Sequence, residues 1–347
     1  MSSPQKETPT ALSGKEFNTY RSSNNKLTTI PSTIPSTLLP HQILIRITHS
    51  GVCYTDYEYF KYGSPAALGH EGVGLVEAVG SSVRSVSIGD RVGTGFLRDS
   101  CMDCRYCLTG KDIWCLDRAV FGLGDIEQGS FSGYYIGKEG YVFKIPEGLA
   151  SADAAPLQCA GATVYSALAD NVRPGDRVGI LGVGGLGHLA IQFAEKMGNQ
   201  VVVFSTSRDK ETEARGFGAS EFVLLGELEK LSKPVDVLII AGAKYPDWEK
   251  VLVKEIVARL GTIIPLPAPT MGPYVLPASQ IFWEGYKLHS SLTASRAQHV
   301  EMLEFAARHN IKPAVQLYEF KGPETVEDIF EKLGKNQVRY RAVLVMP

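Results

Sequence analysis

Four cysteines stand within fifteen residues of this 347-residue chain, at Cys101, Cys104, Cys107 and Cys115. Four thiolates in so short a segment match a closed, tetrahedral zinc site of the kind that stabilises a loop. Disulfides are the alternative use of clustered cysteines, but they are typical of small exported domains. The polar first residues of this chain lack the basic and apolar layout of a signal peptide. We therefore expect a structural zinc site in a protein of the cytoplasm.

The other two cysteines and one histidine indicate a second metal site. Cysteine is often buried without any function and a lone histidine is usually a core residue, so Cys53, His70 and Cys159 each have a simple alternative. Together they supply the two thiolates and one imidazole of a known type of catalytic zinc site, which keeps a fourth position open. Thr55 would add a hydroxyl for proton transfer, and Asp56 a carboxylate that can orient the histidine.

The distribution of apolar residues predicts an α/β protein of two domains. Short β-type runs separated by glycines fill residues 43–146, which indicates a β-rich unit. After residue 152, apolar strands alternate with helical stretches, as in a parallel, doubly wound sheet. We expect a catalytic, zinc-binding domain formed by residues 26–155 and 293–347, and a dinucleotide-binding domain formed by residues 156–292.

Other segments carry more local expectations. Residues 1–25 are rich in Ser, Thr, Asn and Pro and are expected to form a partly ordered tail. Helical spacing of apolar residues predicts helices within WEKVLVKEIVARLG, residues 248–261, and within HVEMLEFAARHN, residues 299–310. An aromatic residue is more often part of a core than of a site. The aromatic residues that could line an apolar substrate pocket are Tyr57, Tyr59, Phe60, Trp114, Phe282 and Trp283.

A glycine-rich loop follows the first strand of the alternating region and opens its first helix. It fits the pattern G-x-G-x-x-G, which is weak alone but gains weight from the strand before it and the helix after it. The glycines would allow a tight turn and a close approach to a pyrophosphate, and the helix amino terminus near Leu186 would offer unpaired N–H groups. A glycine-rich turn without a ligand is the alternative. The loop consists of Gly182, Val183, Gly184, Gly185, Leu186 and Gly187.

The end of the next strand indicates which dinucleotide is preferred. An NAD-selective site usually has an acidic residue at this point, which binds the ribose hydroxyls. Here small hydroxyl side chains are followed by two cations, a combination that suits a 2′-phosphate, although Asp209 dilutes the positive charge. The pattern favours NADP(H) over NAD(H), and its residues are Ser205, Thr206, Ser207, Arg208 and Lys210.

From about residue 40 to 345 the chain resembles the medium-chain zinc-dependent alcohol dehydrogenases. The resemblance is carried by GVCYTD, GHEGVG, the cysteine quartet, APLQCAGATVYSAL, GVGGLG and VRYRAVL. FSTSRDK and SSLTASR resemble the NADP-dependent branch that includes cinnamyl alcohol dehydrogenases and broad aldehyde reductases. The family implies a GroES-like catalytic domain and a Rossmann dinucleotide-binding domain.

The resemblance also implies roles for individual residues. Three catalytic zinc ligands are implied at Cys53, His70 and Cys159, with Glu71 as a carboxylate that can approach or displace the open ligand position. Thr55 is implied as the hydroxyl of a proton relay, and Asp56 as the partner of a ligand histidine. Two further residues are implied near the cofactor: Thr163, and Arg341 beside the phosphates.

Three departures from the family pattern concern the substrate side of the site. Glu58 stands where many members have the histidine that ends the proton relay, and Tyr54 stands where an Arg or His often meets the pyrophosphate. The segment between Cys53 and His70 is several residues shorter than usual, which changes one wall of the substrate pocket. The family's substrates therefore do not transfer directly to this chain.

We predict a zinc-dependent oxidoreductase that transfers a hydride between NADP(H) and a primary alcohol or aldehyde, aromatic ones included. Its partners would be that small molecule and a second copy of the chain. No nucleic acid is expected, because 35 basic residues are balanced by 37 acidic ones, and no apolar run is long enough for a membrane span. A reductase acting on an iminium or conjugated double bond is the alternative; Glu58 favours it and Thr55 disfavours it. A non-catalytic binding protein on the same scaffold is a third possibility.

Overall fold

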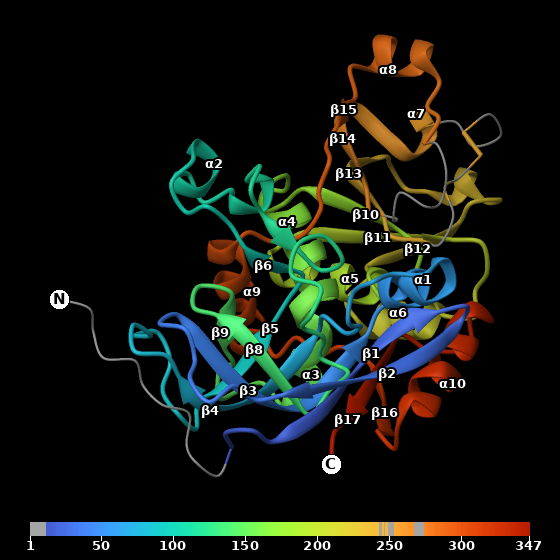
Figure 1. The fold of residues 1–347 in the computed structure, drawn as a ribbon. Helices are drawn as coiled ribbons and strands as arrows, with labels where there is room; N and C mark the ends of the chain where they lie inside the picture. The colour runs from blue at the N-terminus through green and yellow to red at the C-terminus, as the bar shows by residue number, and fades with distance from the viewer. Residues whose placement is uncertain (1–11, 243–244, 246, 249–252, 267–273) are drawn as a thin grey trace. The chain divides into compact units, whose positions relative to one another are not determined.

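The computed structural model describes residues 12–242, 245, 247–248, 253–266 and 274–347. By its internal contacts the chain divides into two units, drawn in Figure 1. Unit 1 is formed by Met1–Cys159 and Ala294–Pro347, and unit 2 by Ala160–Thr293. Among the helices that the structure describes, none is long and apolar enough to cross a membrane.

Unit 1 is built on a seven-stranded sheet with the order β16–β17–β3–β4–β5–β9, in which β8 also pairs with β3. Strand β17 runs parallel to β16 and antiparallel to β3, so two segments far apart in the sequence share one sheet. The expected β-rich unit is thereby confirmed. The strands are β3 (Gln42–Val52), β4 (Gly72–Val79), β5 (Arg91–Thr94), β8 (Tyr134–Lys138), β9 (Val142–Lys144), β16 (Val315–Glu319) and β17 (Arg341–Val345).

A hairpin at the amino-terminal side of unit 1 corrects the expectation of a partly ordered tail from Glu16 onward, while residues 1–11 of that expected tail lie outside the described residues. Strands β1 (Glu16–Ser23) and β2 (Lys26–Thr33) pair antiparallel along their whole length, and Asn24 and Asn25 turn between them with positive φ. Asparagine tolerates this conformation, which two-residue hairpin turns require. The polar composition of β1 did not indicate a strand, because the contacts that hold β1 in place come from distant residues. The Leu68 N–H donates to the carbonyl of Tyr20, whose side chain is buried.

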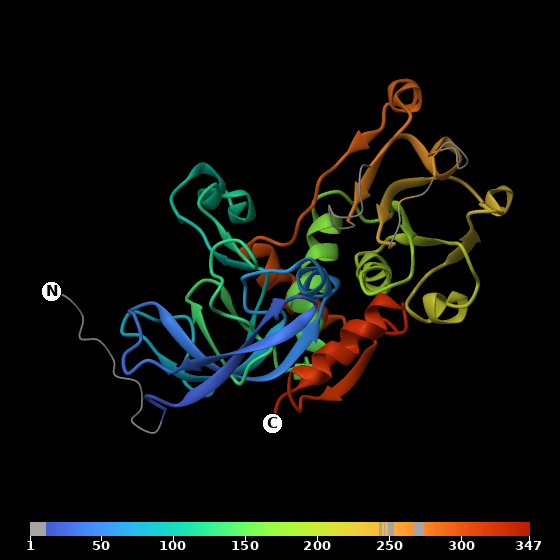
Figure 2. The same cartoon turned by 45° about the vertical axis from the view of Figure 1, so that its right-hand side comes forward.

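Helix α10 (Pro323–Gly334) covers part of the sheet of unit 1, and Figure 2 shows it beside β16 and β17. It buries Val326, Ile329 and Phe330, which follow the helical spacing of three and four residues, and proline occupies its first turn. These side chains join the core formed by the inward residues of β3 and β17. The other α-helices of unit 1 are α1 (Tyr54–Tyr62), α2 (Arg105–Leu108), α3 (Ser151–Pro156) and α9 (Arg296–Arg308).

Unit 2 contains a six-stranded, all-parallel sheet with the order β12–β11–β10–β13–β14–β15. Numbered in chain order, the strands are arranged 3-2-1-4-5-6. This is the doubly wound arrangement, in which the order of the strands, not their direction, reverses between the first and fourth strands. The predicted dinucleotide-type fold is therefore confirmed. The strands are β10 (Arg177–Leu181), β11 (Gln200–Ser205), β12 (Glu221–Leu224), β13 (Val235–Ile240), β14 (Val257–Pro265) and β15 (Lys287–Leu288), with helices α4 (Ala162–Ala169), α5 (Gly187–Lys196), α6 (Glu211–Gly216) and α8 (Ala278–Glu284).

One helix of unit 2 is shorter than the spacing predicts. In the segment 248–261, helix α7 covers Val253–Ile256, and residues 257–261 belong to β14, while residues 249–252 lie outside the described residues. Val257 pairs with Val235 of β13 ahead of an irregularity in the register. Pairing with a central strand buries this apolar residue, and that tertiary contact outweighs the local helical pattern. Helix α9 confirms the other expected helix, with Ser295 and Gln298 forming a capping box at its start.

Candidate metal and cofactor sites

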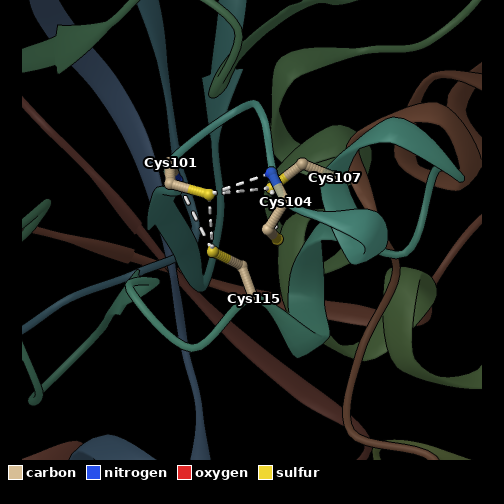
Figure 3. Close-up of side chains that lie close together, drawn as sticks. All are labelled: Cys101, Cys104, Cys107 and Cys115. Atoms are coloured by element: carbon tan, nitrogen blue, oxygen red, sulfur yellow. Dashed lines mark hydrogen bonds between the residues drawn. The ribbon is translucent and has the colours of Figure 1, made fainter.

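The four clustered cysteines of unit 1 point their sulfur atoms toward a common centre (Figure 3). They come from the segment between β6 (Leu97–Asp99) and β7 (Ala119–Val120), around α2 and the short helix η1 (Asp112–Trp114). Sulfur atoms are 3.5 Å apart for Cys101 and Cys115, 3.6 Å for Cys104 and Cys107, and 3.9 Å for Cys101 and Cys107. A tetrahedron with Zn–S bonds of about 2.3 Å has edges of about 3.8 Å, so the spacing fits zinc.

Backbone and hydroxyl groups around the quartet favour thiolates over disulfides. The N–H of Cys104 donates to the Cys101 sulfur at 3.4 Å, and the N–H of Cys101 donates to the Cys115 sulfur at 3.5 Å. The Tyr141 hydroxyl donates to Ser100 Oγ at 2.6 Å, and Ser100 Oγ lies 3.2 Å from the Cys107 sulfur. None of the six cysteines, all of which lie in the described part of the chain, forms a disulfide. The quartet therefore forms a closed site, without a position open for substrate.

The second cluster brings together the residues expected at a catalytic metal. The ligand atoms of Cys53, His70, Glu71 and Cys159 all lie within 4.8 Å of one another. Cys53 directly precedes α1, and His70 and Glu71 stand just before β4. Cys159 lies in a π-helical turn, η2 (Leu157–Gly161), that links α3 to α4. Such turns are rare and occur frequently at functional sites.

Asp56 holds this cluster in place from α1. Its side chain is fully buried, and Oδ2 accepts the Cys53 N–H at 3.1 Å. Oδ1 accepts the Gly69 N–H at 2.9 Å and lies 3.2 Å from Nδ1 of His70. The carboxylate thus fixes the two segments that carry the predicted metal ligands Cys53 and His70. It also places the ring proton of His70 on Nδ1, which leaves the lone pair of Nε2 for a cation.

The charges in the cluster fit zinc. Nε2 of His70 is buried and, among the described residues, has no hydrogen-bond partner of good geometry. Burial disfavours a charged ring, but the Asp56 carboxylate outweighs burial and raises the pKa of His70 to about 10. A hydrogen bond from Cys159 holds the pKa of the Cys53 thiol well below its usual value, against the effect of burial. Zinc binding would displace the proton from Nε2, because a metal ligand must be deprotonated.

Glu71 forms a buried ion pair with Arg341, the first residue of β17. Nη2 of Arg341 donates to both carboxylate oxygens of Glu71. Burial raises the pKa of Glu71 to about 7, and the guanidinium opposes that rise. A Cβ on Gly51 would lie 1.9 Å from Oε2 of Glu71, so glycine is required to leave room for the carboxylate. Arg341 therefore positions Glu71, and its contact with cofactor phosphates stays a prediction.

The two side chains considered for proton transfer both lie on α1. The Thr55 hydroxyl lies 3.7 Å from the Cys53 sulfur and is partly exposed, beside the metal cluster. Glu58, one helical turn further on, is buried. Tyr54, in the place of a pyrophosphate-binding cation, is exposed. Thr55 thus lies beside the metal cluster, and its role in proton exchange stays a prediction.

The glycine loop of unit 2 connects β10 to α5, and its three motif glycines have different surroundings. Gly182 has φ of +96°, and a Cβ there would lie 2.7 Å from Cα of Gly242. A Cβ on Gly187 would lie 1.9 Å from the Gly182 carbonyl oxygen, so helix and loop pack in direct backbone contact. A Cβ on Gly184 would meet nothing within 4 Å. These are the three roles that a pyrophosphate loop needs: a tight turn, an open backbone face and a close helix contact.

The polar loop after β11 has its own hydrogen bonds within unit 2. Lys210 Nζ donates to the Val183 carbonyl at 3.0 Å and so ties this loop to the glycine loop. Arg208 donates to Glu211 at 2.7 Å and to Glu227 at 2.6 Å. The Ser207 hydroxyl donates to Asp209, and its N–H to the Ser205 hydroxyl. Thr206 is exposed. Arg208 therefore already has two carboxylate partners, and a 2′-phosphate would have to compete with them for its guanidinium.

The remaining predicted side chains occupy ordinary positions within their units. Thr163 is buried in α4, where its carbonyl accepts a hydrogen bond from Ser166. Tyr59 stacks on Phe121, and Phe60 and Tyr57 pack against Phe330, so these aromatic rings contribute to the core of unit 1. Trp114 is partly exposed, and Phe282 and Trp283 of α8 are 76% and 75% exposed.

Comparison with known proteins identifies the family to which the chain belongs. Residues 39–147 match the Alcohol dehydrogenase GroES-like domain. Over 322 residues the chain is 34% identical to the probable formaldehyde dehydrogenase AdhA of Bacillus subtilis (strain 168), covering 88% of this chain and 90% of that protein. The chain belongs to the medium-chain zinc-type alcohol dehydrogenase family. Its two thiolate clusters fit the zinc sites of that family.

Other members of the alcohol dehydrogenase family are similar along most of the chain. The NADP-dependent alcohol dehydrogenase C 1 of Mycolicibacterium smegmatis is 32% identical, with 88% of this chain and 90% of that protein covered. The solved structure of a cinnamyl alcohol dehydrogenase from Sorghum bicolor has a TM-score of 0.85 and 30% identity, covering 95% of this chain and 98% of that one. A Helicobacter pylori enzyme of the same name, complexed with NADP(H), has a TM-score of 0.84 at 25% identity, with the same coverage.

Two buried polar groups near the zinc cluster were not predicted from the sequence. The Arg98 guanidinium donates to the carbonyls of Asp125 and Gln128, both at 2.7 Å, and to that of Gly69 at 3.3 Å, beside His70. Gln158 directly precedes Cys159 and contacts His299. For Gln158 a signal existed, because a glutamine interrupts the otherwise apolar and small residues of APLQCAG.

Proposed function

We propose that this protein is an NADP-dependent zinc alcohol dehydrogenase or aldehyde reductase acting on primary alcohols and aldehydes, aromatic ones included. The observation that carries the proposal is the buried cluster of Cys53, His70 and Cys159, in which Asp56 orients an imidazole toward two thiols. Two thiolates and a neutral imidazole would cancel the charge of Zn²⁺ and leave one position for substrate. The family membership and the NADP(H)-bound relative support the same reaction.

In this proposal Cys53, His70 and Cys159 hold zinc, which supplies a Lewis acid for the substrate oxygen, while NADPH supplies the hydride. Asp56 keeps the His70 ring in one tautomer and orientation through the bond to Nδ1. Arg341 holds Glu71 next to the ligands by a buried ion pair, so that a carboxylate is available without being free to move away. Unit 1 thus acts as the catalytic domain and unit 2 as the nucleotide-binding domain.

Thr55 is the residue that we assign to proton transfer. Its hydroxyl is close to a ligand thiol and partly exposed, so it can exchange a proton with a substrate oxygen and with its surroundings. Glu58 follows Thr55 by one helical turn on α1 and is the chain's candidate for the next step of the relay. A reductase of an iminium or a conjugated double bond would not need this relay, which is how the two candidate functions differ.

The preference for NADP(H) rests on the loop after β11. This loop offers the hydroxyl groups of Ser205, Thr206 and Ser207 and the cations Arg208 and Lys210, and it has no carboxylate at the end of the strand. Arg208 would exchange one of its carboxylate partners for a 2′-phosphate, with which it can form a charge-assisted pair.

The proposed assembly is a homodimer. Strand β15 lies at the edge of the sheet of unit 2, and several apolar side chains nearby are exposed. A second copy would cover such an edge and remove unpaired strand groups from solvent. The exposed side chains are Leu260, Phe282, Trp283 and Leu288. Light scattering would show a mass of about twice 37.7 kDa, and replacement of Trp283 by Ser should shift it toward the monomer.

The proposed compartment is the cytoplasm. Six cysteines without a disulfide suit a reducing compartment.

The decisive experiment is oxidation of NADPH or NADH by the purified protein with cinnamaldehyde. Turnover with a preference for NADPH, lost in a Cys159→Ser variant of unchanged melting temperature, is the expected result. Absence of turnover with either cofactor from zinc-loaded protein would favour the iminium or double-bond reductase. Full activity in Cys159→Ser would contradict the zinc assignment.

A further inference from the structure

A buried polar pair lies directly behind the proposed zinc ligand Cys159. The side chain of Gln158 is fully buried, and His299 of α9 is 4% exposed. Nε2 of His299 lies 2.9 Å from Oε1 of Gln158. Both residues belong to unit 1, and neither contributes an atom to the metal cluster.

The hydrogen bonds give the pair a fixed direction. Nε2 of Gln158 donates to the Ala154 carbonyl at 3.0 Å, in the helix that leads into the π-helical turn. The amide oxygen of Gln158 is therefore the acceptor, and the His299 ring donates through Nε2. Loss of one side chain would leave Oε1 of Gln158 or Nε2 of His299 buried without this partner, which costs about 1–3 kcal/mol. The arrangement of the two side chains is thus strongly preferred over its alternatives.

The slot for this pair is built from two glycines of β5 and the segment after it. A Cβ on Gly93 would lie 2.4 Å from the Gln158 amide. A Cβ on Gly95 would lie 2.8 Å from the Gln158 carbonyl oxygen and 3.1 Å from Cε1 of His299. The His299 ring also stacks on Phe143 of β9, with ring centroids 3.9 Å apart and planes 9° apart. Strand β5, the segment after it and strand β9 therefore confine the side chains of Gln158 and His299.

We propose that His299 is a positioning residue of the catalytic zinc site, acting through Gln158 on the π-helical turn that presents the Cys159 thiolate. A π-helical turn is intrinsically less favourable than the α-helical turns around it and needs tertiary contacts to persist. The hydrogen bond from His299 supplies such a contact one residue before the ligand. The proposal rests on the proposed zinc site, and it assigns to His299 the geometry of a ligand, not a chemical step.

The test is the rate at which each of the two zinc ions leaves the protein to a colorimetric chelator. The zinc of the quartet serves as an internal control. A Cys53→Ser/Cys159→Ser variant should keep only that zinc, so it identifies the kinetic phase in which the quartet releases its zinc. In His299→Leu and Gln158→Leu the catalytic zinc should leave about tenfold to a hundredfold faster, as for other partners of metal ligands. The rate for the quartet should stay unchanged. His299→Gln, which can still donate to Gln158, should restore slow release.

Two further variants separate positioning from general stability. Gln158→Leu/His299→Leu removes both side chains of the hydrogen bond together, so its melting temperature should return toward that of the parent while catalytic zinc release stays fast. Phe143→Leu loosens the same slot but keeps the hydrogen bond, so it should lower the melting temperature with little change in zinc release. If zinc release follows melting temperature across all variants, the role is structural and the proposal is wrong.

Failure of the proposed function gives a different result from failure of this proposal. Parent protein that holds two zinc ions but turns over no aldehyde would overturn the proposed activity, and the release rates would still decide the role of His299. Parent protein that holds zinc in the quartet alone would overturn the catalytic site and this proposal together.

Discussion

Oδ1 of Asp56 lies 3.2 Å from Nδ1 of His70, and this contact joins α1 to the segment before β4. The same carboxylate also accepts backbone N–H groups from Cys53 and Gly69. One buried side chain therefore sets both the orientation of a ligand imidazole and the paths of two ligand-bearing segments.

Asp56→Asn should weaken zinc binding at the catalytic cluster. An amide offers one acceptor oxygen where the carboxylate offers two, so at least one of its N–H partners loses an acceptor. We expect an affinity loss of about tenfold to a hundredfold, measured by competition with a chelator. Glu77→Gln, which breaks the Arg46 pair on β3 and β4, is the control and should leave zinc affinity unchanged. Equal affinities for Asp56→Asn and the parent would show that Asp56 does not orient the ligands.

Gly51→Ala should displace Glu71. The added Cβ would fall 1.9 Å from Oε2 of Glu71, which Arg341 holds in place. Overpacking of this kind lowers the unfolding free energy by about 1–3 kcal/mol. Urea denaturation would measure the loss. The matched variant Gly133→Ala places its Cβ where nothing lies within 4 Å and should have parental stability.

Gly184→Ala and Gly187→Ala should fail in different ways. A Cβ on Gly184 meets no neighbour, so the protein should fold normally but bind NADPH more weakly, because the methyl group occupies the open face of the loop. A Cβ on Gly187 meets the Gly182 carbonyl at 1.9 Å, so this variant should melt at a lower temperature. Melting curves and fluorescence titration with NADPH separate the two effects. Normal NADPH affinity in Gly184→Ala would argue against a pyrophosphate at this loop.

Arg208→Ala should raise the KM for NADPH by roughly tenfold, because a charge-assisted pair with the 2′-phosphate is lost. The KM for NADH should change little. Arg215→Ala removes a cation that pairs with Glu211 on α6 and serves as the control. Equal changes with both cofactors would mean that Arg208 does not select NADPH.

The stability of the protein should depend on the protonation of His299. Burial lowers the pKa of this ring to about 3, from an ordinary value of 6.5. Because the unfolded chain takes up this proton first, the stability present above pH 6.5 is lost as the pH falls toward 3. The contribution is up to about 1.4 kcal/mol per pH unit. Urea unfolding of His299→Gln should show a flatter pH dependence than the parent over this window. Coincident curves would mean that His299 is not kept neutral by the fold.

The regular features of the fold were predictable because each has a short-range pattern. Buried parallel strands such as β10 are continuous apolar runs, and the loop that follows must contain glycine to make its turn. The metal cysteines were predictable as well, since four thiols in one segment have few other uses. The roles assigned to individual residues remain predictions.

Features that depend on distant segments were not predictable. Strand β1 has a polar composition and is defined by its ladder with β2, and Val257 is drawn into β14 by pairing with β13. The contact of Gln158 with His299 joins residues 141 positions apart, and no local periodicity encodes it. Arg341 was expected near phosphates, whereas its partner in unit 1, Glu71, becomes evident from the sheet that places β17 beside β3.

The position of β17 has a consequence for how the protein is made. Unit 2 is contiguous, so all six of its strands have been synthesised once residue 293 has left the ribosome. The sheet of unit 1 stays divided until residues 341–345 emerge, because β17 lies between β16 and β3. Arg341 arrives with that strand, so the buried ion pair with Glu71 forms only then. During translation the nucleotide-binding unit can therefore fold first, and the zinc pocket is completed by nearly the last residues to be added.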